Sequence, residues 1–138
     1  MKKLIIILIL VLVSATSFGQ KIKQGNTIGV HTLTFELNPD YTMAEAEDYL
    51  VNKYIPLFEK HHPGIKSYFT KSIRGTNKGS FGWINVVESL ETLRKYYDDD
   101  GRATELERSI REKMKPEVDK INEIFKNRNN VYNTWLIL

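Results

Sequence analysis

The sequence contains no cysteine, so it has neither a disulfide framework nor a cysteine nucleophile. It also lacks the P-loop and GxGxxG motifs of nucleotide-binding proteins, the GxSxG motif of serine hydrolases and the HExxH motif of zinc proteases. Covalent hydrolases and nucleotide-dependent enzymes are therefore not predicted. The acidic turn Asp98–Asp100 lacks the alternating ligand spacing of a calcium loop and is interpreted as a solvated turn.

The surplus of positive over negative charge is small outside the first residues. The formal net charge at pH 7 is +3, and removal of Lys2 and Lys3, from a stretch without acidic residues, lowers it to +1. A nucleic-acid-binding protein needs a persistent basic face. No nucleic-acid partner is therefore predicted.

The first 19 residues have the pattern of a secretory signal peptide. Two lysines are followed by the apolar run Leu4–Val13 and the small-residue stretch Ser14–Gly19. The run is too short for a membrane-spanning helix, which needs about 20 apolar residues. We expect cleavage just before Gln20 or Lys21, with an uncleaved anchor as the alternative. No cysteine follows the small residues, which excludes lipidation at a lipobox.

A cleaved leader would leave an exported protein, periplasmic or secreted, with no stable membrane span. Residues 20–138 are enough for one domain with a single hydrophobic core. The predicted organisation is therefore a signal peptide at residues 1–19 and one domain at residues 20–138.

Alternating apolar and polar residues predict four β-strands, at Thr27–Leu37, Lys66–Arg74, Ser80–Glu88 and Val131–Leu138. The second and third strands flank the turn-forming group Gly75–Gly79, a β-hairpin pattern. Asn127–Asn130 is predicted to form a turn before the last strand.

Apolar residues at helical spacing predict helices at Met43–His61, Leu90–Tyr97 and Ala103–Phe125. Thr42 with Glu45 forms a capping box, and Ser89 is the predicted N-cap of the second helix. Pro56 and Pro116 lie inside the two long patterns, where each removes a backbone hydrogen bond and predicts a kink or a break.

The resulting order, β-α-β-β-α-β, predicts an α+β fold of the ferredoxin-like type with a four-stranded antiparallel sheet. Its first and third strands are expected to be central, with the helices on one face. Both faces are apolar: the third strand presents Trp83 on one side and Ile84 on the other, and the last presents Trp135 and Leu136. One helical layer covers only one face. We therefore expect a homodimer that pairs the remaining sheet faces.

Three stretches resemble the dimeric α+β barrel superfamily, particularly its antibiotic-monooxygenase-like, stress-responsive and NIPSNAP-type domains. They are His31–Phe35 in the first strand, Tyr54–Ile65 across the first helix and its turn, and Phe81–Leu90 in the third strand. The resemblance implies two ferredoxin-like subunits packed sheet to sheet. It also implies a small-molecule pocket between sheet and helices, with cofactor-independent monooxygenase or isomerase-like chemistry as one alternative.

His31 is the candidate catalytic residue. It lies on a predicted strand, and the resemblance implies that a polar residue there faces the pocket. The near-neutral pKa of histidine would suit a base or a donor toward an aromatic molecule. The alternative is a strand-end histidine that bonds only to backbone or solvent.

Candidate ligand-binding residues are those that could line a pocket with aromatic walls and polar groups: His31, Tyr68, Trp83, Asn85 and Trp135. Aromatic side chains on strands are equally typical of a core or an interface. His61 and His62 point in different directions near a helix end and do not predict a metal pair.

Three functions stay open at this point. The first is a binding protein for a small hydrophobic or aromatic molecule, the second is an enzyme of the implied type, and the third is a non-catalytic self-association module. No cofactor or metal is predicted; haem is a weak alternative for a hydrophobic pocket.

Overall fold

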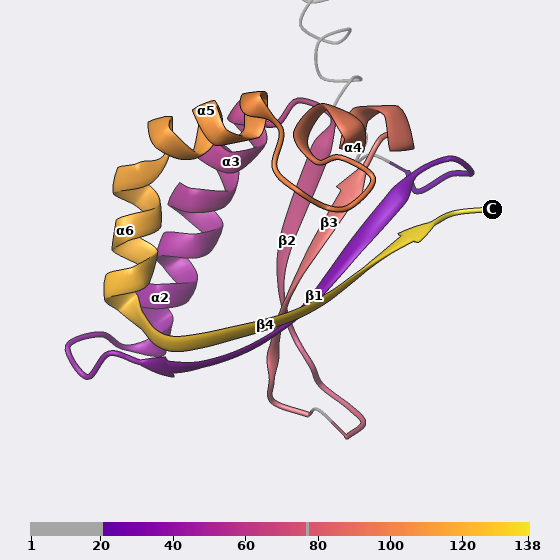
Figure 1. Ribbon diagram of the computed structural model, residues 1–138. Helices are drawn as coiled ribbons and strands as arrows, with labels where there is room; N and C mark the ends of the chain where they lie inside the picture. Colours follow the sequence, from indigo (N-terminus) through magenta and orange to yellow (C-terminus); the bar gives the residue numbers. More distant parts are fainter. Residues whose placement is uncertain (1–20, 77) are drawn as a thin grey trace, which may run out of the picture.

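The computed structural model describes residues 21–76 and 78–138, and the predicted signal peptide lies outside them. The chain forms an α+β domain in which the helices gather on one side of a curved antiparallel sheet (Figure 1). In chain order the elements are β1 (Thr27–Leu37), α2 (Met43–Tyr49), η1 (Leu50–Tyr54), α3 (Ile55–His61), β2 (Ile65–Lys71), β3 (Phe81–Val87), α4 (Leu90–Tyr96), α5 (Glu105–Lys113), α6 (Lys115–Ile124) and β4 (Phe125–Leu136).

The strand order is β2-β3-β1-β4, with every neighbouring pair antiparallel. The first and third strands are therefore central, which confirms the predicted ferredoxin-like topology. β1 has the predicted bounds, and β2 and β3 form the predicted hairpin. The hairpin strands are shorter than expected, and Gly75 and Gly79 take left-handed φ angles of 88° and 90° in the connecting loop.

Both prolines interrupt the long helices, as predicted, but they do so by different geometries. Before Pro56 the helix widens into the π-helical turn η1, in which Ile55 N–H donates to the carbonyl of Leu50, five residues earlier. Pro116 instead lies in the first turn of α6, after a break at Met114 that separates α6 from α5. A proline tolerates this position because a first-turn N–H has no partner within its helix.

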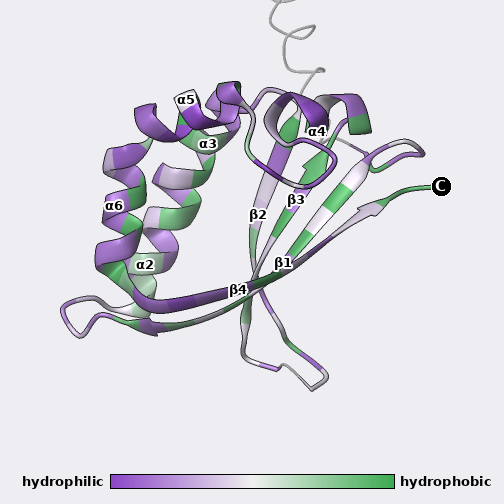
Figure 2. Ribbon diagram, in the orientation of Figure 1, coloured by the Kyte–Doolittle hydropathy of each residue, from purple (hydrophilic) through white to green (hydrophobic). Residues whose placement is uncertain are grey.

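β4 corrects the prediction for the C-terminal segment. The strand begins at Phe125, directly after α6, and runs through residues 127–130, which were predicted to form a turn; Lys126, Asn129 and Asn130 pair with β1. Asn127 has a positive φ of 49°, and the β1–β4 register shifts between Thr34 and Glu36, so the asparagine-rich stretch accommodates an irregularity within one continuous strand. The first half of β4 is strongly hydrophilic (Figure 2).

The core lies between the sheet and the helices and consists of two clusters of buried side chains. One joins α2, η1 and α6 to the start of β4, and the other joins β2 and β3 to α4 and α5. Among the described residues, no helix is both long and apolar enough to span a membrane.

Candidate functional site

A cavity of about 430 Å³ lies between the helix-facing side of the sheet and α4, α5 and the loop that joins them. We call it the His31 cavity. Its apolar walls come from Phe58, Ile65, Val87, Leu90 and Leu93, and polar side chains reach it from the sheet and from the α4–α5 region. This volume and this mixture are typical of small-molecule sites.

His31 lies on the helix-facing side of β1, as required of a cavity residue. Its ring stacks on Tyr132 of β4, with centroids 5.3 Å apart, and its Nδ1 lies 3.1–3.2 Å from the side-chain amide of Asn130. Burial lowers the pKa of His31 below its ordinary 6.5, and the hydrogen bond to Asn130 only partly offsets this. The imidazole is therefore neutral at pH 7.

Gly29 leaves space beside the other ring nitrogen. A Cβ built at Gly29 would lie 3.6 Å from His31 Nε2 and 3.7 Å from the Cβ of Asn85. All three residues line the cavity. The absence of a side chain at Gly29 therefore opens the floor of the cavity next to Nε2, while Nδ1 is occupied by Asn130.

Asn85 is held in a defined orientation on β3. Its Oδ1 accepts hydrogen bonds from Ser67 Oγ at 2.6 Å and from Trp83 Nε1 at 2.8 Å. Because both partners are donors, the atom they contact must be the amide oxygen and not the nitrogen. The Nδ2 group is therefore the remaining donor of this side chain. No described residue accepts from Nδ2, which makes it available to a molecule in the cavity.

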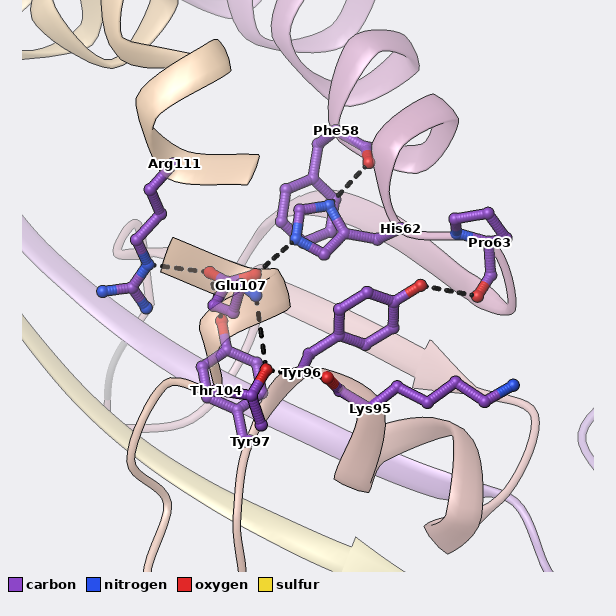
Figure 3. Close-up of polar contacts among 9 residues, drawn as sticks. All are labelled: Phe58, His62, Pro63, Lys95, Tyr96, Tyr97, Thr104, Glu107 and Arg111. Atoms are coloured by element: carbon purple, nitrogen blue, oxygen red, sulfur yellow. Dashed lines mark hydrogen bonds and ion pairs between the residues drawn. The ribbon is translucent and has the colours of Figure 1, made fainter. Parts of the chain in front are cut away.

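A buried ion pair supports the opposite wall. His62, at the end of α3, and Glu107, on α5, are 1% and 3% exposed, and His62 Nε2 lies 2.8 Å from Glu107 Oε2 (Figure 3). His62 Nδ1 lies 2.8 Å from the carbonyl oxygen of Phe58, whose ring stacks on the imidazole. The sequence pattern placed His62 at a helix end and did not indicate this pairing.

Glu107 connects this pair to the cavity. Its Oε1 accepts from Arg111 Nε at 2.7 Å and from the Tyr97 hydroxyl at 3.1 Å, and both donors line the His31 cavity. Burial raises the pKa of Glu107, but the hydrogen bonds and charges of His62 and Arg111 outweigh burial and hold it below 4.5. Burial, together with the negative charge of Glu107, raises the pKa of Tyr97. Glu107 is therefore ionised and Tyr97 is a neutral donor at pH 7.

The sheet separates the five predicted ligand-binding residues. His31 and Asn85 line the cavity, and Trp83 supports Asn85 from the same face while its ring packs against Tyr54 and Phe58. Tyr68 pairs with Ile84, and Trp135 with Ile28, on the opposite face. These two are 48% and 60% exposed and are not part of the His31 cavity, because strand alternation turns them away from it.

Sequence analysis missed five polar or aromatic residues of the site: Tyr97, Glu107, Arg111, Asn130 and Tyr132. The predicted turn at 127–130 removed Asn130 from the sheet, and the charged faces of the last helices were interpreted as solvated. Tyr132 lies opposite His31 in the β1–β4 register. The sequence could have indicated this only through the alternation of side chains along a strand with the correct bounds of β4. In the described part of the chain, no three His, Asp or Glu side chains are grouped as a metal site.

No protein-family model matches the sequence, and no curated protein matches it. Among solved structures, the chain is similar to SnoaB, a cofactor-independent oxygenase from Streptomyces nogalater, with 15% identity, a TM-score of 0.47, and coverage of 83% of this chain and 94% of SnoaB. It is also similar to a dimeric ferredoxin-like protein of unknown function from Bacteroides fragilis (13% identity, TM-score 0.41, coverage 83% and 100%). A third is a proposed antibiotic biosynthesis monooxygenase from Caulobacter crescentus (17% identity, TM-score 0.39, coverage 83% and 92%).

Proposed function

We propose that this chain binds a flat aromatic small molecule in the His31 cavity. The observation that carries the proposal is the cavity itself: its volume of about 430 Å³ lies within the usual range for small-molecule sites. Its apolar walls suit an aromatic ring, and His31 Nε2 and Asn85 Nδ2 are polar atoms on the sheet side that can bind a substituent. The haem alternative has no support among the described residues.

Proton-transfer chemistry on the bound molecule is the second candidate, of the isomerase or cofactor-independent oxygenase type. His31 favours it, because its lowered pKa keeps the imidazole neutral at pH 7 and able to accept a proton. The stack on Tyr132 and the contact with Asn130 hold the ring in place.

Gly29→Ala tests the binding proposal. At pH 7 the wild-type protein is expected to bind naphthalenemethanol, a neutral two-ring probe, in isothermal titration calorimetry. The alanine methyl occupies the floor beside His31 Nε2, so the variant should bind at least about tenfold more weakly. Its contacts are at ordinary van der Waals distance, so the fold is expected to tolerate it.

Thr32→Ala is the matched control, because Thr32 lies on the same strand but faces the other side of the sheet. It should bind the probe as tightly as the wild type does. A wild-type protein that takes up no naphthalenemethanol would contradict the proposal, as would equal affinity in the Gly29→Ala variant.

We also propose that two copies associate through the sheet face that carries no helices. The register places Ile28, Val30, Tyr68, Ile84, Val131 and Trp135 on this face, and four of them are exposed large hydrophobic residues. We call it the outer sheet face. An apolar surface of this kind on a soluble domain favours a protein partner, and a second copy is the simplest one.

Export is the remaining proposal, and it rests on the leader pattern of residues 1–19. Expression in a bacterium with an intact secretion system should yield a mature chain that begins at Gln20 or Lys21. Intact-mass spectrometry of the periplasmic and culture fractions measures this end directly. Recovery of the chain only with Met1–Gly19 attached would count against cleavage.

A further inference from the structure

The buried pair of His62 and Glu107 leaves a third charged residue, Arg111, without a counter-charge of its own. Both ring nitrogens of His62 face oxygen acceptors, the carbonyl of Phe58 and the carboxylate of Glu107. A carbonyl and an ionised carboxylate only accept hydrogen bonds, so His62 satisfies both contacts as the doubly protonated imidazolium. Glu107 therefore has a cationic partner already, before Arg111 is counted.

Arg111 is the second cation on the same carboxylate. Its Nε donates to Glu107 Oε1, while His62 donates to Oε2. One negative charge thus faces two positive charges. Because His62 is buried and Arg111 is more than half exposed at the cavity, the surplus positive charge lies at the Arg111 end of the network.

The other charges at the cavity leave this surplus in place. Arg94 binds Asp99 through two nitrogen–oxygen contacts, at 2.7 and 3.3 Å, so these two charges offset each other. Asp98 is exposed, and its Oδ1 accepts hydrogen bonds from the backbone N–H groups of Asp100 and Arg102. Its carboxylate is therefore held by the backbone of the α4–α5 loop. The guanidinium of Arg111 is then the main cationic group that faces the cavity.

The geometry points to a selective site for an aromatic anion, in which Arg111 contacts the carboxylate or phenolate of the ligand and Glu107 and His62 are positioning residues. The inference rests on the proposed binding of an aromatic molecule and specifies that this molecule is negatively charged. Glu107 fixes Arg111 through Nε, which leaves the outer edge of the guanidinium for the ligand. A guanidinium is a strong, geometrically specific partner for a carboxylate.

The two walls give the ligand a direction. Its charged group would lie toward α5, beside Arg111 and the hydroxyl of Tyr97, and its ring would lie against Phe58 and Leu93. A second polar substituent would reach His31 Nε2 or Asn85 Nδ2 on the sheet. The expected ligand class is therefore a one- or two-ring aromatic acid or phenol with a further oxygen substituent.

The test compares naphthoate, an anion at pH 7, with naphthalenemethanol, its neutral counterpart of similar shape. The wild-type protein is expected to bind naphthoate at least about tenfold more tightly, as a charge-assisted hydrogen bond implies. In Arg111→Gln this preference should disappear, because the affinity for naphthoate falls much further than the affinity for naphthalenemethanol. Arg108→Gln is the control, because it removes the same charge from α5 at a residue that does not line the cavity.

Positioning by Glu107 is tested with Glu107→Asp, which keeps the charge but shortens the side chain and withdraws the carboxylate from Arg111. Its preference for naphthoate over naphthalenemethanol should fall severalfold, a result that general loosening of the fold would not produce, because loosening would weaken the binding of both probes alike. Tyr97→Phe, which leaves Glu107 and Arg111 paired, should keep most of the preference.

The outcomes separate the two proposals. If the wild-type protein binds neither probe, the proposed function fails as well. If it binds both equally, or if Arg111→Gln keeps the preference for naphthoate, aromatic binding stands and the anion inference is wrong. If Arg111→Gln loses the preference but Glu107→Asp does not, the positioning role of Glu107 is wrong.

Discussion

Replacement of Glu107 by glutamine is expected to lower the free energy of unfolding by about 3–5 kcal/mol, the usual cost of removing one partner from a buried ion pair. Glu107 is 3% exposed and accepts from His62, Arg111 and Tyr97, and a neutral amide oxygen cannot replace both carboxylate oxygens. In the variant, the His62 imidazolium would therefore be buried without a carboxylate partner, or His62 would have to lose a proton. Urea unfolding at pH 7, followed by circular dichroism, measures the loss.

Glu112→Gln is the matched control, since Glu112 lies on the same helix and is exposed. Its effect is expected to stay within about 0.5 kcal/mol, as for most surface substitutions. If the two variants unfold at the same urea concentration, the buried pair does not stabilise the fold in the way the geometry implies.

The same pair predicts how stability depends on pH. The pKa of Glu107 is lower in the folded chain than its ordinary 4.5, so below pH 4.5 the unfolded chain binds the proton first. The contribution of Glu107 is then present above pH 4.5 and is lost as the pH falls through the lower folded pKa. The difference in unfolding free energy between wild type and Glu107→Gln should accordingly shrink from pH 7 to pH 3. A difference that is independent of pH would contradict this assignment.

Local sequence patterns predicted those strands and helix ends that a regular alternation of apolar and polar residues, or a capping residue, marks in the sequence. β1 was predicted to the residue because apolar and polar side chains alternate until Asn38 and Pro39, and Ser89 caps α4 as its type and position indicated. Pro56 and Pro116 were recognised as interruptions, but sequence could not choose between a π-helical turn and a complete break. That choice depends on how each helix packs on the sheet.

The site residues that were not predicted from the sequence were missed for one physical reason: each reaches the site through contacts between distant parts of the chain. The first half of β4 is an edge segment whose side chains are exposed after Phe125, so no alternation between core and solvent marks it as a strand. The pairing of β4 with β1 brings Asn130 to His31 across 99 positions of sequence, and the packing of α3 on α5 brings Glu107 to His62 across 45. His31 was identifiable as a single residue, but its partners were not, because each depends on a long-range register.

The two tryptophans are expected to respond in opposite ways to aspartate. Trp83 faces the helices, packs on Tyr54, Phe58 and Phe69 and donates to Asn85, so Trp83→Asp should lose at least about 3–5 kcal/mol of stability and fail to fold at 37 °C. Trp135 lies on the outer sheet face and is 60% exposed, so Trp135→Asp should leave the subunit fold intact. Circular dichroism melts distinguish the two. Unfolding of both variants, or of neither, would mean that the faces are assigned wrongly.

Because Trp135→Asp is expected to keep its fold, this variant can also test the proposed dimer. In sedimentation equilibrium the wild-type chain from Gln20 onward is expected to be a dimer. Placing a charge among Ile28, Val131 and their copies should weaken it at least about 30-fold, the effect of a central interface residue. Asn122→Asp, which adds the same charge to the exposed side of α6, should leave the dimer unchanged. A wild-type monomer at 100 µM would show that the outer sheet face stays uncovered in solution, and its exposed side chains would then need a different partner.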